Sequence, residues 1–208
     1  SNRGALTVAE FELQRTKIVS AITRLNADVV GLMEIENNGY GDNSAIANLV
    51  AALNAAQPDE ADHYAWVASP DGQPIGTDAI TVGLIYRPAS VTPEGAASLI
   101  ELPVQQAEAQ DASGKPVAIK QGMRESLLQR FSSPKGDAPL TLVVNHLKSK
   151  GSACFEDYPD YATADPLDGQ GHCNALRVSA AKVLGERLKE VSGDLLLIGD
   201  LNAYGMED

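Results

Sequence analysis

The sequence lacks any apolar run long enough to cross a membrane, because a spanning helix needs about 20 consecutive apolar residues and every run here is far shorter. It also lacks internal repeats and any stretch with the composition of a linker. A length of 208 residues is enough for one domain with its own core. We therefore expect a single domain over residues 1–208. The chain begins with Ser1 and not with Met, which suggests a processed or engineered piece.

Positive charge is scarce. Lysine and arginine number 16 against 28 aspartates and glutamates, and the formal net charge is −12 at pH 7. Such a charge argues against a simple polyanion binder. If the ligand is a nucleic acid, metal ions and a local basic strip must overcome the repulsion. Lys148 and Lys150 form a small basic strip of this kind.

Cysteine is nearly absent, since only Cys154 and Cys173 occur. Both lie in polar, loop-like sequence rich in Gly, Asp and Pro, where a buried thiol would be out of place. We predict a disulfide between them, which implies an oxidising compartment. In the chain-entropy model this bond would stabilise the fold by about 3 kcal/mol. Two inert buried thiols are the alternative.

Polar side chains follow three predicted apolar strands at their carboxyl ends. The first and third of these strands are expected to be buried on both faces. Because sites of α/β proteins commonly lie at the carboxyl edge of a sheet, we expect the polar groups to share one floor. The strands are 28–34, 140–145 and 195–198, and the polar residues are Glu34, Asn145, His146, Asp200 and Asn202.

The remaining elements follow from periodicity and from cap and turn signals. Residues 105–115 are polar and are expected to form an exposed loop. The predicted helices are 7–25, 44–53 and 174–191, and the further strands are 63–68, 79–86, 97–102 and 126–131.

The polar residues at these strand ends suggest a metal site. Glu34, Asp200 and Asn202 would supply hard oxygen ligands, which suit Mg²⁺, Mn²⁺ or Ca²⁺ and not zinc. His146 could act as a general acid or as a phosphate ligand.

Each of these residues also has a structural alternative. Asp200 could be a capping residue, and Glu34 could pair with a lysine at its strand end. Arg124 could be a salt-bridge residue. The acidic segment 156–168 is expected to be a solvated loop, with a Ca²⁺ site as the alternative.

Three motifs resemble the endonuclease/exonuclease/phosphatase superfamily, which includes pancreatic-type deoxyribonucleases. They are Leu32-Met33-Glu34, Asn145-His146-Leu147-Lys148-Ser149 and Gly199-Asp200-Leu201-Asn202-Ala203. The segment 168–177, together with Cys154, more narrowly resembles secreted bacterial extracellular nucleases.

The resemblance implies an α/β (α+β) fold, a four-layer α-β-β-α sandwich with two mixed sheets. It implies a secreted, divalent-metal-dependent nuclease that hydrolyses phosphodiester bonds in DNA, with RNA as a further substrate. The cofactor would be Mg²⁺ or Mn²⁺, with Ca²⁺ as an alternative. The resemblance implies that the catalytic residues are Glu34, His146, Asp200 and Asn202. Of these, Glu34, Asp200 and Asn202 would also be the metal ligands. The substrate-binding residues would be Arg124, Asn145 and Asp78.

Two departures from the family pattern imply an incomplete fragment that lacks the first and last strands. No strand ending in Asn precedes Glu34, and no Asp-His pair follows Asn202. The one Asp-His pair, Asp62-His63, lies elsewhere. We therefore expect other domains or segments in the full-length protein, and little or no hydrolytic activity from the 208 residues alone.

Two other functions remain open on the same scaffold. The first is a phosphomonoesterase or phospholipase, and the second is a non-catalytic binding module. The disulfide and the resemblance together predict an extracellular or periplasmic protein, or one anchored at the cell surface through segments outside this chain.

Overall fold

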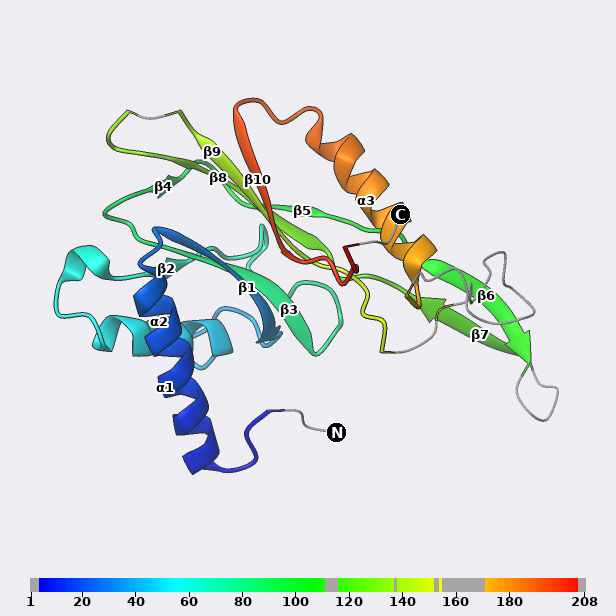
Figure 1. Ribbon diagram of the computed structural model, residues 1–208, viewed down its shortest axis with the longest axis horizontal. Helices are drawn as coiled ribbons and strands as arrows, with labels where there is room; N and C mark the ends of the chain where they lie inside the picture. The colour runs from blue at the N-terminus through cyan, green and yellow to red at the C-terminus, as the bar shows by residue number, and fades with distance from the viewer. Residues whose placement is uncertain (1–3, 111–115, 137, 152–153, 155–170, 206–208) are drawn as a thin grey trace.

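The computed structural model describes residues 4–110, 116–136, 138–151, 154 and 171–205, with no side chains described for 105–121 (Figure 1). The predicted acidic loop 156–168 lies outside these ranges. The elements are α1 (Val8–Leu25), β1 (Val29–Glu36), α2 (Ala45–Ala55), the 3₁₀ turn η1 (Glu60–Asp62), β2 (Ala65–Trp66), β3 (Ile80–Tyr86), β4 (Thr92–Pro93), β5 (Ser98–Ile100), β6 (Gln105–Gln110), β7 (Pro116–Gln121), β8 (Ser126–Ser132), β9 (Leu140–His146), α3 (Asn174–Leu188) and β10 (Asp194–Asp200).

Two sheets form the centre of the molecule. The first has the strand order β1-β3-β2 and is antiparallel throughout. The second has the order β10-β9-β8-β4, with β5 also paired to β8. It is mixed, because β10 runs parallel to β9 while the other pairs are antiparallel.

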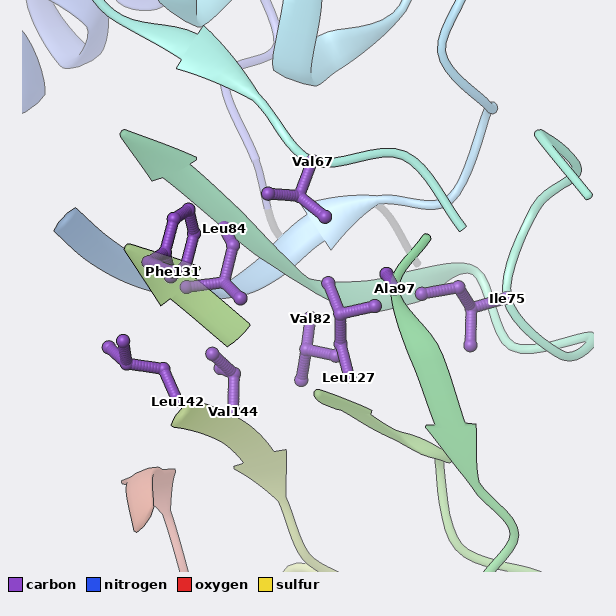
Figure 2. Close-up of a cluster of buried hydrophobic side chains, with 9 residues drawn as sticks. All are labelled: Val67, Ile75, Val82, Leu84, Ala97, Leu127, Phe131, Leu142 and Val144. Carbon is purple, nitrogen blue, oxygen red and sulfur yellow. The ribbon is translucent and has the colours of Figure 1, made fainter. Parts of the chain in front are cut away.

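Alternation along the strands fixes the order of the layers, because successive side chains point to opposite faces of a sheet. On β3, Leu84 packs into the core between the sheets (Figure 2). Ile85, the next residue, packs against α1 and α2. On β9, Val144 lies in the same inner core, whereas Val143 packs against α3. The predicted four-layer α-β-β-α sandwich is therefore confirmed.

The first two helices begin where their sequence signals predict. Thr7 caps α1 in a capping box with Glu10, which satisfies two backbone N–H groups that the first turn leaves unpaired. Asn26 ends the helix in the left-handed conformation, with φ of 49°. Ser44 caps α2. None of the helices in the described ranges is both long and apolar enough to cross a membrane.

The prediction that strand 195–198 is buried on both faces is wrong. It forms the main part of β10, an edge strand of the five-stranded sheet, and Leu195, Leu196 and Leu197 are 39%, 47% and 40% exposed. The first strand, β1, is likewise only partly buried, and it becomes exposed at Met33 and Glu34. An apolar run indicates what a strand can bury, but the number of layers that pack on it depends on the rest of the fold.

The prediction of a loop over 105–115 is wrong for residues 105–110, which form β6. Residues 105–110 and 116–121 pair as an antiparallel hairpin, with Gln105 opposite Gln121 (Figure 1). Polar sequence without hydrophobic alternation gives no strand signal, so the backbone pairing could not be anticipated from it. Residues 111–115 lie outside the described residues.

The two sheets approach each other closely at Gly31. A Cβ atom there would lie 2.5 Å from Cδ1 of Ile198 and 3.2 Å from Cγ2 of Val144. Glycine therefore lets the first half of β1 cross β10 and β9 near the carboxyl ends of those two strands, and β1 then continues to its own carboxyl end at Glu36. These ends lie on the same side of the molecule (Figure 1), which is where the sequence places its candidate site.

Candidate active site

Parallel pairing places the ends of β9 and β10 side by side. Asp200 is in register with His146, and Gly199 is in register with Asn145. The backbone N–H of Leu147 then donates to the carbonyl of Asp200 over 2.9 Å, so the pairing extends one residue beyond the strands. The second and third sequence motifs therefore meet at one point.

Gly199 makes this close pairing possible. Its φ is 127°, a conformation that residues with a side chain rarely adopt. A Cβ atom there would lie 2.0 Å from the carbonyl oxygen of Asn145. The glycine of the Gly-Asp-Leu-Asn motif thus sets the position of Asp200 against β9.

The turn after β10 is fixed by hydrogen bonds. The backbone N–H of Asn202 donates to Oδ1 of Asp200 over 2.8 Å, and Nδ2 of Asn202 donates to the carbonyl of Leu147 over 3.0 Å. Asn202 itself is left-handed, with φ of 51°. Asp200 therefore caps its own turn, as one alternative anticipated, yet its second carboxylate oxygen and Oδ1 of Asn202 take no part in these bonds.

A β-bulge presents Glu34. Along β1, Leu32 pairs with Gly83 but Ile35 pairs with Thr81, so Met33 and Glu34 together oppose one residue of β3. Glu34 has φ of 60°, which costs a residue with a side chain about 1–3 kcal/mol. Bulges often redirect a side chain beside a functional site. Within the described ranges Glu34 makes no ion pair with a lysine, the alternative that the sequence left open.

His146 is the residue on which the other candidate groups converge. It is only 4% exposed, and its Nδ1 atom has no hydrogen-bond partner among the described residues. Burial, and next the positive charge of Arg124, lower the pKa of His146 below 6.5. The negative charges of Asp200, Glu34 and Asp78 oppose this shift. Residues from both sheets and from two loops therefore surround one imidazole.

Arg124 and Asp78 form an ion pair at the edge of the site. Nη2 of Arg124 lies 2.9 Å from Oδ2 of Asp78, with the two side chains 21% and 49% exposed. The Nε atom of Arg124 is buried and has no partner among the described residues. Arg124 is thus a salt-bridge residue, as one alternative anticipated, and it also retains an unused donor.

Asn37 holds Asp78 in place, a role that the sequence did not predict. Its side-chain Nδ2 donates to the carbonyls of Ile75 and Asp78 over 2.8 and 2.9 Å. Its backbone N–H donates to the carbonyl of Ala79. The end of β1 is therefore tied to the loop that carries Asp78. In the sequence Asn37 had only the signal of a turn.

Asn145 does not face the site as predicted. Its side chain is fully buried, and its Oδ1 accepts a hydrogen bond from Ser126 on β8. Its Nδ2 donates to the carbonyls of Val143 and Ile198 over 3.3 and 3.2 Å. Asn145 therefore joins three neighbouring strands beneath the site. The motif alone could not distinguish it from its neighbour His146, on which the site's charges act.

The Asp62-His63 pair lies outside the site, as the sequence suggested. His63 follows the η1 turn, and its Nε2 lies 3.2 Å from the carbonyl of Gln57. Asp62 contacts Arg87 instead, at 3.6 Å. The charges of Asp200, Glu34, Asp78 and Arg124 act on the pKa of His146.

The donor set fits magnesium better than zinc. The part of the chain that the structure describes contains no group of three His, Cys, Asp or Glu side chains that could hold a metal. Mg²⁺ is commonly bound by one or two carboxylates, with waters and substrate phosphates completing its shell. Glu34 and Asp200, with the amide oxygen of Asn202, match that pattern.

The predicted disulfide between Cys154 and Cys173 is present, with a Cα–Cα distance of 5.0 Å. Both cysteines are fully buried and pack against Leu176 of α3. Cys173 is also the N-cap residue of α3, directly before Asn174. The bond therefore anchors the amino end of α3.

No family model matches the sequence, and no curated protein matches it significantly. Solved structures do match. D. rerio TDP2 humanized by 14 mutations aligns with a TM-score of 0.54 at 17% identity, over 97% of this chain and 60% of that one. D. rerio TDP2 complexed with single strand DNA product aligns with a TM-score of 0.56 at 18% identity, over 93% of this chain and 55% of that one.

The human Nocturnin catalytic domain with bound sulfate anion gives a TM-score of 0.56 at 14% identity, over 94% of this chain and 59% of that one. Identities this low establish the fold alone, which this chain shares with TDP2 and with the Nocturnin catalytic domain. The chain spans between 55% and 60% of the length of these three structures.

The pKa of His146 provides a direct test of this arrangement. In an NMR titration of the metal-free protein, we expect a value below 6.5. Arg124→Gln should raise it, because a nearby cation is removed, and Asp200→Asn should lower it further. Below pH 6.5 the unfolded state then binds more protons than the folded state, so the free energy of unfolding decreases as the pH falls through this range. A lower pKa in the Arg124→Gln variant would contradict the proximity of the two groups.

Proposed function

We propose that the protein is a divalent-metal-dependent hydrolase of phosphodiester bonds, with residues 1–208 forming its catalytic domain or a part of it. One observation carries the proposal. Glu34 and Asp200 come from different sheets, and both act electrostatically on the buried imidazole of His146, next to Arg124. Carboxylates, an imidazole and a guanidinium that act on one another suit a metal ion and a phosphate group.

Glu34, Asp200 and Asn202 would hold Mg²⁺, with Mn²⁺ or Ca²⁺ as alternatives. When bound, such a metal supplies charge that stabilises the phosphate oxygens and the leaving oxygen. Arg124 would bind a phosphate oxygen through its unused donor. Water attacks phosphorus, and the bond to the leaving oxygen breaks.

The lowered pKa of His146 favours the phosphate-ligand role over the general-acid role. Its imidazole is neutral at pH 7, and a neutral imidazole donates one hydrogen bond. A phosphate anion bound beside it would raise this pKa, because opposite charges favour the protonated form. His146 would then donate to the phosphate more strongly as negative charge develops there.

DNA is the substrate class that we favour, with RNA as a second possibility. A structure with the same fold is complexed with single strand DNA product, which supports a nucleic acid substrate. The resemblance of segment 168–177 to secreted bacterial nucleases and the buried disulfide support an extracellular or periplasmic protein. A phosphomonoesterase, a phospholipase or a non-catalytic binding module is the competing assignment.

A gel assay on supercoiled plasmid DNA tests the proposal, with Mg²⁺, with Ca²⁺ and with a chelator. We expect nicking with Mg²⁺ and none with the chelator. Turnover by the 208 residues should be slow, because the one Asp-His pair of the sequence, Asp62-His63, lies outside the site. Metal-independent cleavage, or hydrolysis of phosphomonoesters alone, would contradict the proposed function.

A further inference from the structure

One exposed aromatic side chain lies beside the candidate site. Among the described residues the exposed aromatic ones are Phe11, at 43%, and Tyr204, at 62%. Phe11 lies on α1, whereas Tyr204 follows Asn202 by two residues. A single exposed ring is common on protein surfaces, so its position and its contacts decide whether it has a role.

The turn that leads to Tyr204 is fixed against the chain that follows β9. Besides the two bonds between this turn and Leu147, Nζ of Lys150 donates to the carbonyl of Asn202. The Cα atoms of Asn202 and Tyr204 lie at most about 7 Å apart, because only two residues separate them. A base attached to a phosphate at the site can therefore reach the Tyr204 ring.

Lys150 also covers one face of the Tyr204 ring. Its ammonium lies 3.8 Å from the ring centre, well within the range of about 6 Å over which a cation is attracted to an aromatic face. Because the same ammonium donates to the carbonyl of Asn202, the ring is held in a fixed position relative to the turn. A residue that is 62% exposed with a cation over one face of its ring presents the other face to solvent.

A nucleobase is the chemical group that suits such a face. Stacking requires a flat aromatic surface that is open on one side, and it accepts every base because each base has a π face. A ring that is already held in place loses little conformational entropy when it binds. A phosphate group has no flat face, so Tyr204 offers nothing to a phosphomonoester that carries no ring.

We propose that Tyr204 forms a base-stacking subsite, in which a nucleobase next to the phosphodiester being cleaved packs on the ring face opposite Lys150. This inference rests on the proposed function and narrows its substrate class to polynucleotides with an unpaired base beside the cleaved bond. In a duplex each base is already paired and stacked, and both interactions would have to be broken before the base could pack on Tyr204.

The experiment measures binding of two fluorescent oligomers by anisotropy, in chelator. The first is single-stranded oligothymidylate, and the second is an abasic oligomer of the same length, which keeps the phosphates but has no bases. Tyr204→Ala should weaken binding of oligothymidylate about 5- to 100-fold, the range for the loss of one stacked base, and should leave binding of the abasic oligomer unchanged. Tyr204→Phe should bind oligothymidylate as the wild type does, because it keeps the ring.

Phe11→Ala is the matched control. Phe11 is likewise exposed, and the guanidinium of Arg15 lies over its ring at 5.7 Å from the centre. It lies on α1, however, in the helical layer outside the first sheet. We expect Phe11→Ala to bind both oligomers as the wild type does.

The comparison between the two oligomers decides the inference. A Tyr204→Ala variant that loses no more affinity for oligothymidylate than Phe11→Ala does overturns the subsite. An equal loss on the abasic oligomer also overturns it, because the ring would then only support the turn. Cleavage with Mg²⁺ tests the proposed function separately. A wild-type protein that stacks oligothymidylate on Tyr204 but cleaves no phosphodiester bond contradicts the proposed function and not the stacking.

Discussion

Replacing Asp200 with asparagine is expected to weaken Mn²⁺ binding about 100-fold, which corresponds to about 3 kcal/mol. The substitution removes one negative charge from the metal but keeps an oxygen that can accept the hydrogen bond from Asn202. The turn should therefore persist, and the loss should reflect the charge alone. Calorimetry with Mn²⁺ measures the affinity, and phosphodiester hydrolysis should fall in parallel.

Asp194→Asn is the matched control for this change. Asp194 begins the same strand that Asp200 ends, so the chemical change is identical but lies at the opposite end of β10. We expect the Asp194→Asn variant to bind Mn²⁺ as the wild type does. Equal losses in the two variants would mean that net charge, and not a local site, governs the affinity.

The second large effect is expected from Gly199→Ala. The new Cβ atom would meet the backbone of Asn145 at 2.0 Å, and a backbone atom cannot move aside as a flexible side chain can. The φ of 127° adds strain for any residue with a side chain. We expect the free energy of unfolding to decrease by more than about 3 kcal/mol, measured by urea denaturation.

Gly185→Ala serves as the control for this variant. Gly185 lies within α3, and an added Cβ there would meet nothing within 4 Å. Alanine in a helix interior stabilises by about 0.5–1 kcal/mol relative to glycine. An unchanged stability for Gly199→Ala would show that β10 and β9 are not packed as closely as described.

Much of the fold was predictable because its signals are local. The capping box at Thr7 and Glu10 and the Ser44 cap set the starts of α1 and α2. Glu34, His146 and Asp200 were likewise predictable as strand-end residues. The sequence also predicted that they share one polar floor. It could not predict how they meet, since that depends on a parallel pair, a bulge and a glycine crossing.

Other features required the three-dimensional arrangement. The leucines of β10 looked like a strand buried on both faces, but the strand lies at a sheet edge and is exposed. Asn145 sits in the same motif as His146 yet points into the fold, because neighbouring residues on a strand face opposite ways. Arg177 of α3 donates a hydrogen bond to the carbonyl of Lys148, and no local signal in the sequence predicts this contact.

The most direct test of the central claim is paramagnetic broadening by Mn²⁺ in the NMR spectrum of the histidine rings. His63 follows η1 next to β2, and β2 pairs with β3 at the Val29 end of β1, about 17 Å along β1 from Glu34. We predict that substoichiometric Mn²⁺ broadens the His146 resonances well before those of His63. The Glu34→Gln variant should require much more Mn²⁺ for the same effect. Equal broadening of His146 and His63, or no difference between Glu34→Gln and wild type, would contradict a metal site formed by Glu34 and Asp200 beside His146.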